Sequence, residues 1–165
     1  MVSRFRHAAL VGKYQSEGIR GVLEGIAHFL VRQGLEVSME RQTALNTGIT
    51  DFGALTPDEL GRECDLAVVV GGDGTMLGIA RQLSRHGTPL VGINQGRLGF
   101  ITDVNVGQYE QALAPMIAGD YEEECRTMLA VAPRLTTTSL SERPSKMRSP
   151  SRQTPPSIMA RCSSS

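Results

Sequence analysis

The stretch that most constrains this fold is an apolar run over residues 66–70, which follows Asp65 and leads directly into Gly71-Gly72-Asp73-Gly74-Thr75. The run does not alternate between polar and apolar residues, which predicts a central parallel strand that is covered on both faces. Glycines let the backbone turn sharply and come close to a ligand. Backbone N–H groups at the start of a following helix suit phosphate oxygens. We therefore expect a strand, a ligand-binding turn and a helix.

Asp73 is the unusual residue of this turn, because a carboxylate inside a phosphate-binding loop repels phosphate. Such a residue is useful only where it does something that glycine cannot do. It could accept a proton, hold a metal ion or bind a sugar hydroxyl. Asp73 is therefore a candidate catalytic or binding residue.

Predicted strands and amphipathic helices alternate along the N-terminal part of the chain. The expected strands are residues 8–11, 35–40, 65–70 and 89–93, and the long helices are residues 16–34 and about 75–86. This alternation predicts an α/β fold, a parallel Rossmann-like sheet with right-handed crossovers. Ligands of such sheets bind at the carboxyl ends of the strands, where residues 71–75 and 94–100 are both expected to lie.

Capping patterns predict where several helices begin and end. Ser16 is the expected N-cap of the first helix, and Gly34 is its expected end. Thr56-Pro57-Asp58-Glu59 has the pattern of a capping box with proline at the first helical position. Thr75 or a neighbour is expected to cap the helix after the glycine turn. Residues 41–55 have no clear pattern and are left unassigned.

Shorter elements are expected further along the chain. Residues 98–101 are predicted to form a short strand, and residues 106–117 a helix that Pro115 kinks or ends. Residues 121–131 are expected to form a strand. The acidic run at its start, residues 122–124, is interpreted as a solvent-exposed surface and not as a metal site.

Composition narrows the class of protein. The chain has 165 residues, which suits one ordinary domain or one domain plus a fragment, and only 4% are aromatic, so the core must be aliphatic. A formal net charge of zero argues against nucleic-acid partners and against a basic membrane surface. The sequence contains no signal-peptide pattern and no apolar run of transmembrane length. The three cysteines include no C-x-x-C pair, so we expect buried free thiols in a reducing, cytoplasmic setting.

The chain changes character near residue 132. Residues 1–132 contain 11 Lys/Arg and 16 Asp/Glu, a net charge of −5, whereas residues 133–165 contain six and one, a net charge of +5. The second part has nine serines and five of the eight prolines, but none of the 18 glycines. Its apolar residues follow no period, so we expect it to be disordered. An RNA-binding or phosphorylated tail is the weaker interpretation, because no aromatic residues are interleaved with its charges.

Three general explanations of the glycine turn can be compared. A P-loop requires a lysine after the turn, and none follows. Gly72, Gly74 and Gly78 are spaced one residue too far for the dinucleotide fingerprint, and they lie in the third strand–helix unit and not in the first. A purely structural turn is the remaining alternative, although two glycines followed by Asp-Gly exceed what a turn requires.

The sequence Gly71-Gly72-Asp73-Gly74-Thr75 after a β-branched strand resembles the signature of the NAD kinase family. A second stretch resembles the next motif of that family, Gly92-Ile93-Asn94-Gln95-Gly96-Arg97-Leu98-Gly99-Phe100-Ile101-Thr102-Asp103. Related diacylglycerol, sphingosine and phosphofructokinases share Gly-Gly-Asp-Gly, but the pair of motifs is specific. The resemblance covers about residues 6–131. It implies a nucleotide-binding α/β domain at 1–119, the first strand of an all-β domain at 120–132, and a non-family tail at 133–165.

The resemblance implies a reaction and roles for particular residues. ATP, or polyphosphate in some members, would phosphorylate the 2′-hydroxyl of the adenosine ribose of NAD, with Mg²⁺ or another divalent metal. Asp73 would align that hydroxyl and accept its proton. Gly72 and Gly74 would allow close approach of the dinucleotide, and Phe100 matches a position that lines the NAD pocket. Arg97 could reach a phosphate, and no residue is assigned as a metal ligand.

One part of the family pattern is missing. In the family, a second β-rich domain contributes an Asn-Asp or Asn-Glu pair, a glycine-rich segment and most contacts of the homo-oligomer. This sequence has no such pair and no glycine after Gly119. We therefore expect a truncated or out-of-frame C-terminal part, little or no turnover, and an unpaired edge on the strand at residues 121–131. The alternative functions are a non-catalytic nucleotide-binding fragment and a related lipid or sugar kinase.

Overall fold

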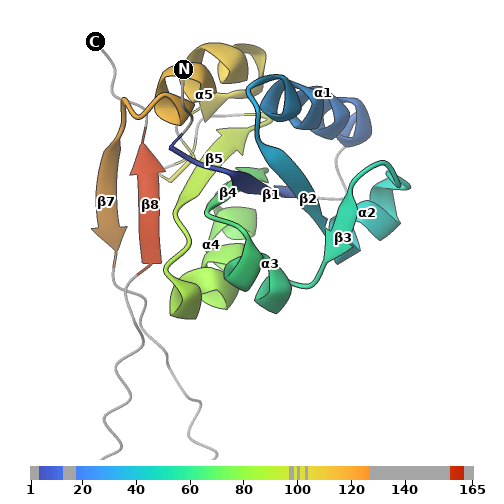
Figure 1. Cartoon of the computed structure of the whole chain (residues 1–165), viewed down its shortest axis with the longest axis horizontal. Helices are drawn as coiled ribbons and strands as arrows, with labels where there is room; N and C mark the ends of the chain where they lie inside the picture. Colours follow the sequence, from blue (N-terminus) through green and yellow to red (C-terminus); the bar gives the residue numbers. More distant parts are fainter. Residues whose placement is uncertain are drawn as a thin grey trace, which may run out of the picture.

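The computed structural model in Figure 1 describes most of the N-terminal part of the chain. The described residues are 4–12, 18–96, 99, 101–102, 104–126 and 157–161. Of the residues named above, Ser16, Arg97, Leu98, Phe100 and Asp103 lie outside these ranges, as does the third cysteine, Cys162.

The strands belong to one sheet with the order β3-β2-β1-β4-β5-β8-β7, and β6 pairs with β5. Their bounds are β1 His7–Gly12, β2 Glu36–Glu40, β3 Gly53–Leu55, β4 Leu66–Val70, β5 Leu90–Asn94, β6 Val104–Asn105, β7 Glu122–Arg126 and β8 Ser157–Arg161. All neighbouring strands from β1 to β6 pair in parallel. The predicted parallel α/β fold is confirmed.

Helices cover both faces of the parallel sheet. Their bounds are α1 Ile19–Arg32, α2 Arg41–Thr47, α3 Pro57–Glu63, α4 Asp73–Leu83 and α5 Tyr109–Ile117, with 3-10 turns η1 Ser84–His86 and η2 Val106–Gln108. Figure 1 shows α1 and α5 on one side of the sheet and α3 and α4 on the other. Apolar side chains of α1 and α5 join one core cluster, and those of α3 and α4 join the other.

The central position of β4 explains its unbroken apolar sequence. β4 lies between β1 and β5, and all five of its residues are buried. Val68 and Val70 belong to the core on the α1 side, whereas Ala67 and Val69 belong to the core on the α4 side. Because successive side chains of a strand point to opposite faces, a strand covered on both faces must be apolar at every position.

Two of the predicted helix boundaries agree with the structure. Thr56 and Glu59 form the expected capping box: the Thr56 hydroxyl accepts from the backbone N–H of Glu59, and the Glu59 carboxylate accepts from that of Thr56. Gly34 follows the end of α1 with φ of 86°, a left-handed conformation that glycine adopts without strain.

Two other boundary predictions are wrong. The N-cap of α1 is Gly18, at φ of 72°, and not Ser16. A left-handed glycine can redirect the chain into the helix without a capping side chain. The helix α4 begins at Asp73 with Gly72 as its N-cap, so Thr75 lies inside the helix.

The unassigned residues 41–55 contain α2 and β3. Glu40 caps α2, because its carboxylate accepts from the backbone N–H groups of Gln42 and Thr43 at 2.8 and 2.6 Å. Glutamate is not among the usual N-cap residues, which is why the sequence pattern is weak there.

Of the strand predicted at residues 98–101, residues 98 and 100 lie outside the described ranges, and residues 99 and 101 are not part of a strand; the next strand, β6, begins at Val104. The predicted helix at residues 106–117 begins as the 3-10 turn η2 and continues as α5. Pro115 lies inside α5, which continues to Ile117, so the proline does not end the helix.

The structure corrects two expectations about the C-terminal part. β7 pairs with β8 in antiparallel fashion, from Glu122 opposite Arg161 to Arg126 opposite Ser157. The expected disorder at residues 157–161 is therefore wrong, and the expected unpaired edge at residues 122–126 holds for only one of the two edges of β7, which is the last strand of the described sheet. An isolated strand leaves its backbone N–H and C=O groups unpaired, so a segment that can extend alongside it gains hydrogen bonds.

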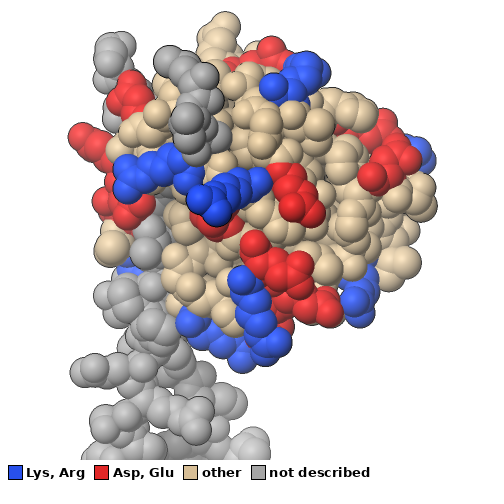
Figure 2. Space-filling model, in the orientation of Figure 1, with Lys and Arg blue, Asp and Glu red and all other residues tan. Residues whose placement is uncertain are grey.

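The surface shown in Figure 2 carries basic and acidic side chains interspersed, not a broad patch of one sign. Asp58, in the first turn of α3, pairs with Arg62, Arg85 and His86. The described part of the chain contains no helix that is both long enough and apolar enough to cross a membrane. Of the cysteines, Cys64 is buried as expected, but Cys125 is exposed.

Candidate functional site

The strand register places the glycine turn, residues 71–75, at the point where the sheet reverses its strand order. Gly12 at the end of β1 lies opposite Val70 at the end of β4, and Val70 lies opposite Ile93 of β5. The backbone N–H of Gly71 donates to the carbonyl of Ile93 at 2.9 Å. From β1 the chain continues outward through β2 and β3, whereas β4 and β5 lie on the other side. In open α/β sheets, ligands bind outside the carboxyl ends of the strands at such a reversal.

The turn leads directly into α4. The carbonyl of Gly72 accepts from the backbone N–H groups of Thr75 and Met76 at 3.0 and 3.1 Å, which closes the first turn of the helix. Asp73 is the first residue of α4. A carboxylate at this position is stabilised by the positive end of the helix dipole, which offsets part of the cost of an acidic residue in the turn.

The three glycines of the turn differ in what surrounds them. A Cβ at Gly71 would lie 2.8 Å from the Thr75 hydroxyl, so packing within the chain requires glycine there. A Cβ at Gly72 or Gly74 would have no described atom within 4 Å. Neither Gly72 nor Gly74 has a positive φ. Packing and conformation of the described chain therefore leave room for another molecule beside these two glycines.

The Asp73 carboxylate contacts the second motif. Its Oδ1 accepts from the backbone N–H of Ile101 at 3.1 Å and from the Thr102 hydroxyl at 3.3 Å. Gly99 packs so closely against this carboxylate that a side chain there would collide with it. Two stretches about 28 residues apart in sequence thus form one site, as their expected positions at the same sheet edge predict.

Thr102 and Asn94 belong to this site, although the motif pattern did not single them out. Thr102 is completely buried and Asn94 is 5% exposed. The Asn94 side-chain amide donates to the Thr102 hydroxyl at 3.1 Å. Gly92 permits this arrangement, because a Cβ there would lie 2.8 Å from the Thr102 methyl group. The sequence could have indicated Asn94 and Thr102 only through their place in the second motif. The fold shows that they lie next to Asp73.

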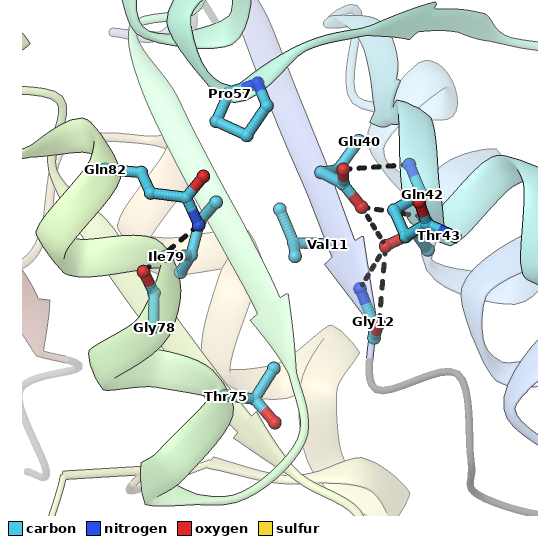
Figure 3. A pocket seen from close by; sticks show the side chains of 10 residues that line it. All are labelled: Val11, Gly12, Glu40, Gln42, Thr43, Pro57, Thr75, Gly78, Ile79 and Gln82. Carbon is cyan, nitrogen blue, oxygen red and sulfur yellow. Dashed lines mark hydrogen bonds between the residues drawn. The ribbon is translucent and has the colours of Figure 1, made fainter.

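A cavity of about 360 Å³ lies on the other side of the turn, between the end of β1, the start of α2 and the side of α4 (Figure 3). Its size is within the range of small-molecule sites. Polar groups of Glu40, Thr43, Thr75 and Gln82 line it, together with apolar groups such as Ile79. The cavity lies on the β1 side of β4, where Gly12 and Thr43 line it, whereas the Asp73 carboxylate contacts Ile101 and Thr102, which follow β5 on the other side of β4.

The cavity wall opposite α4 is held by a buried threonine that the sequence reasoning missed. Thr43 is 1% exposed, and its hydroxyl lies 3.2 Å from the backbone N–H of Gly12 and 2.8 Å from the Glu40 carboxylate (Figure 3). The hydroxyl accepts from Gly12 and donates to Glu40, which already caps α2. These bonds fix the start of α2 against the end of β1.

The described residues do not form a preformed metal site. No group of three or more His, Cys, Asp or Glu side chains within the described ranges could hold a metal ion. The divalent ion that the family resemblance implies therefore has no fitting set of protein ligands in this part of the chain. No step below is assigned to a metal.

Together these features define a class of protein: a parallel α/β domain with a glycine-rich, nucleotide-type site at the reversal of its strand order. The model of the family described as "ATP-NAD kinase N-terminal domain" matches residues 9–121. The chain therefore belongs to the NAD kinase family, which confirms the resemblance inferred from the two motifs.

Similar proteins support the same assignment. The chain is 65% identical over 129 residues to an NAD kinase of Methylibium petroleiphilum, and 58% identical over 129 residues to one of Polaromonas naphthalenivorans. Both matches cover 78% of this chain, but only 43% and 44% of the relatives. The chain thus spans less than half the length of these relatives.

Two solved structures match a similar share of this chain. An NAD kinase from Archaeoglobus fulgidus in complex with ATP matches with a TM-score of 0.54 and 28% identity, over 74% of this chain and 41% of that one. Yeast NADH kinase complexed with NADH matches with a TM-score of 0.64 over 74% of this chain and 40% of that one. Its identity of 16% shows a shared fold alone.

Proposed function

We propose that this chain takes part in phosphorylation of the 2′-hydroxyl of the adenosine ribose of NAD, with ATP or polyphosphate as phosphoryl donor. The observation that carries the proposal is the position of Asp73. Its carboxylate is held by the second family motif at the reversal of the strand order, beside two glycines with open space next to them. Membership of the NAD kinase family supports the same reaction.

With ATP as donor, the ribose 2′-oxygen attacks the terminal phosphorus. The new O–P bond forms as the bond between that phosphorus and the bridging oxygen of ADP breaks, so the products are NADP and ADP. The proton of the hydroxyl passes to the Asp73 carboxylate. A positioned base of this kind contributes about a hundredfold or more to the rate, and the remainder of the barrier falls through alignment and charge neutralisation.

Other residues take roles on either side of Asp73. Gly72 and Gly74 admit the dinucleotide close to the backbone, because no described atom fills the space beside them. The cavity next to Thr75 is proposed for the phosphoryl donor, since its volume suits a small molecule and the Thr75 side chain, in the first turn of α4, lines it. The structure of the Archaeoglobus relative with ATP supports a nucleotide donor. Phe100 as a wall of the NAD pocket stays a prediction, because it lies outside the described residues.

Some finer expectations also stay predictions. Mg²⁺ commonly binds substrate phosphates with few protein ligands, so we expect it to accompany the nucleotide. A cytoplasmic location, homo-oligomer formation and the three-part division at residues 119 and 132 are likewise proposed from the family resemblance.

The test is to incubate the full chain with NAD, ATP and Mg²⁺ and to measure NADP, while NAD binding is followed by titration calorimetry. NADP formation that is abolished in Asp73→Asn, with NAD still bound, would support the catalytic role. NADP formation that persists in Asp73→Asn would show that Asp73 is not the base.

A second candidate is a non-catalytic nucleotide-binding chain, because the open space beside Gly72 and Gly74 would admit a nucleotide whether or not Asp73 acts as a base. That candidate predicts binding without NADP formation, and binding that depends on Gly72 and Gly74 more than on Asp73. A lipid or sugar kinase is less favoured, because the second motif is present and holds Asp73.

A further inference from the structure

The orientation of the Asn94 side chain is determined by its neighbours. Its Oδ1 accepts from the backbone N–H of Gly96 at 2.8 Å. An N–H group can only donate, so the oxygen of the amide must face Gly96. The nitrogen, Nδ2, therefore faces Thr102, at 3.1 Å from its hydroxyl.

This orientation determines where the Thr102 hydroxyl points its hydrogen. An amide nitrogen cannot accept a hydrogen bond, so the Thr102 oxygen must accept from Asn94. The single hydrogen of the hydroxyl is then left for Asp73 Oδ1, 3.3 Å away. The donors run in one direction, from Asn94 through Thr102 to the Asp73 carboxylate.

The fold encloses this series of hydrogen bonds from Asn94 through Thr102 to Asp73. Thr102 and Asn94 are buried, so water does not compete for their hydrogen bonds. The missing side chain of Gly92 lets Thr102 approach β5, and that of Gly99 lets the loop approach Asp73. Ile101 adds a backbone N–H to the same carboxylate oxygen. Two donors on Oδ1 restrain the plane of the carboxylate, so its orientation is set before a hydroxyl arrives.

We infer that Thr102, oriented by Asn94, is a positioning residue that aligns the Asp73 carboxylate with the ribose 2′-hydroxyl. The inference rests on the proposed function for the identity of that hydroxyl. It assigns to the second motif a role in aligning the base, in addition to its contribution to the loop.

The test compares binding of NAD with binding of its analogue that has 2′-deoxyadenosine, by titration calorimetry on the full chain. The ratio of the two dissociation constants reports how well Asp73 engages the 2′-hydroxyl, whether or not turnover occurs. We expect the unmodified chain to favour NAD by about tenfold or more, and Asp73→Ala to lose this preference.

Thr102→Val keeps the shape of the side chain and removes its hydroxyl. We expect it to reduce the preference for NAD by about threefold to tenfold, because the Ile101 N–H still holds the carboxylate. Thr102→Ser keeps the hydroxyl and is expected to retain the preference. Thr88→Val is the matched control, because Thr88 is also buried and donates its hydroxyl elsewhere, to the carbonyl of Gly61. It should lower the melting temperature without changing the preference.

A second measurement needs no ligand. The ¹³C resonance of the Asp73 carboxyl carbon should move in Thr102→Val, return in Thr102→Ser and stay unchanged in Thr88→Val. No preference for NAD in the unmodified chain, with the carboxyl resonance responding as expected, would overturn the proposed function but leave the Thr102–Asp73 contact standing. A preference for NAD that Thr102→Val leaves intact, or a carboxyl resonance that it does not move, would overturn the positioning role.

Discussion

The two sides of the glycine turn, residues 71–75, are built in opposite ways. On one side the chain itself fills the space: Gly99, Ile101 and Thr102 all lie against the Asp73 carboxylate. On the other side the chain leaves a cavity of about 360 Å³ that reaches Thr75 (Figure 3). The same short turn thus separates a filled region from a hollow one.

The difference separates two requirements of a phosphoryl-transfer site. A catalytic base must be held in place before the substrate arrives, which packing and buried hydrogen bonds achieve. A substrate needs room, which glycines and a cavity provide. Substitutions of packed or hydrogen-bonded residues should therefore affect stability, whereas substitutions that place atoms in the open space should affect binding.

The largest expected effect is on the filled side. Gly99→Ala should destabilise the fold by about 1–3 kcal/mol, because its Cβ would collide with the Asp73 carboxylate and displace the loop. Thermal unfolding would measure this loss. Gly96→Ala is a useful control from the same loop, since the nearest described atom to its Cβ would be Asn94 Oδ1, 4.0 Å away. Equal stability of Gly99→Ala and the unmodified chain would show that the loop does not pack on Asp73 as described.

Thr43→Val tests the wall of the cavity. It should cost about 1–2 kcal/mol, because the backbone N–H of Gly12 and the Glu40 carboxylate lose the hydroxyl that joins them. Urea unfolding would measure the change in stability, and titration with ATP would measure whether the cavity still binds a nucleotide. We expect Thr43→Ser to restore both. Failure of Thr43→Ser to restore them would indicate that the methyl group, and not the hydroxyl, holds the wall.

Gly74→Ala should separate stability from binding. Position 74 lies in the first turn of α4, where alanine favours the helix by up to about 1 kcal/mol over glycine. No described atom is near the added Cβ, so the melting temperature should rise slightly. Nucleotide binding should weaken, because the added methyl group would fill the open space beside Gly74. A variant that is both more stable and unchanged in nucleotide affinity would show that no ligand approaches Gly74.

The smallest effect at neutral pH concerns Cys64, which lies away from the turn at the end of α3. Burial raises the pKa of the Cys64 thiol from 9.0 to about 12, with Glu63 and Asp65 adding to the shift. The unfolded chain therefore loses this proton at lower pH than the folded chain does. The resulting stability is fully present below pH 9 and is lost as the pH rises from about 9 towards 12.

Urea unfolding at pH 7 and pH 10 would measure this dependence. Cys64→Ala should show a smaller fall in stability between the two pH values. The exposed Cys125 provides the comparison, because its thiol should react with a thiol reagent in the folded chain, whereas the Cys64 thiol should not. Rapid reaction of Cys64 would contradict its buried position.

Local signals in the sequence were strong enough to predict the sheet and part of the site. The unbroken apolar run of β4 indicated its central position, and the capping box at Thr56 located the start of α3. Asp73 was recognised because an acidic residue is out of place in a phosphate loop.

Other features depended on contacts between distant residues. Ser16 has the right chemistry for an N-cap, but a left-handed Gly18 begins α1 instead. The partner of β7 lies about 35 residues further along the chain, where no local pattern predicts a strand.

By itself, the sequence determined the alternation of the main strands and helices, the family, and Asp73 as the candidate base, because propensity, hydrophobic pattern and motif spacing are local properties. Only the tertiary structure decided what holds Asp73 and where the open space lies. The contact of Thr102 with Asp73 and the cavity between Thr43 and Thr75 arise because parallel pairing aligns the ends of β1, β4 and β5. The register of a sheet is a property of the folded chain, so no single segment of the sequence carries it.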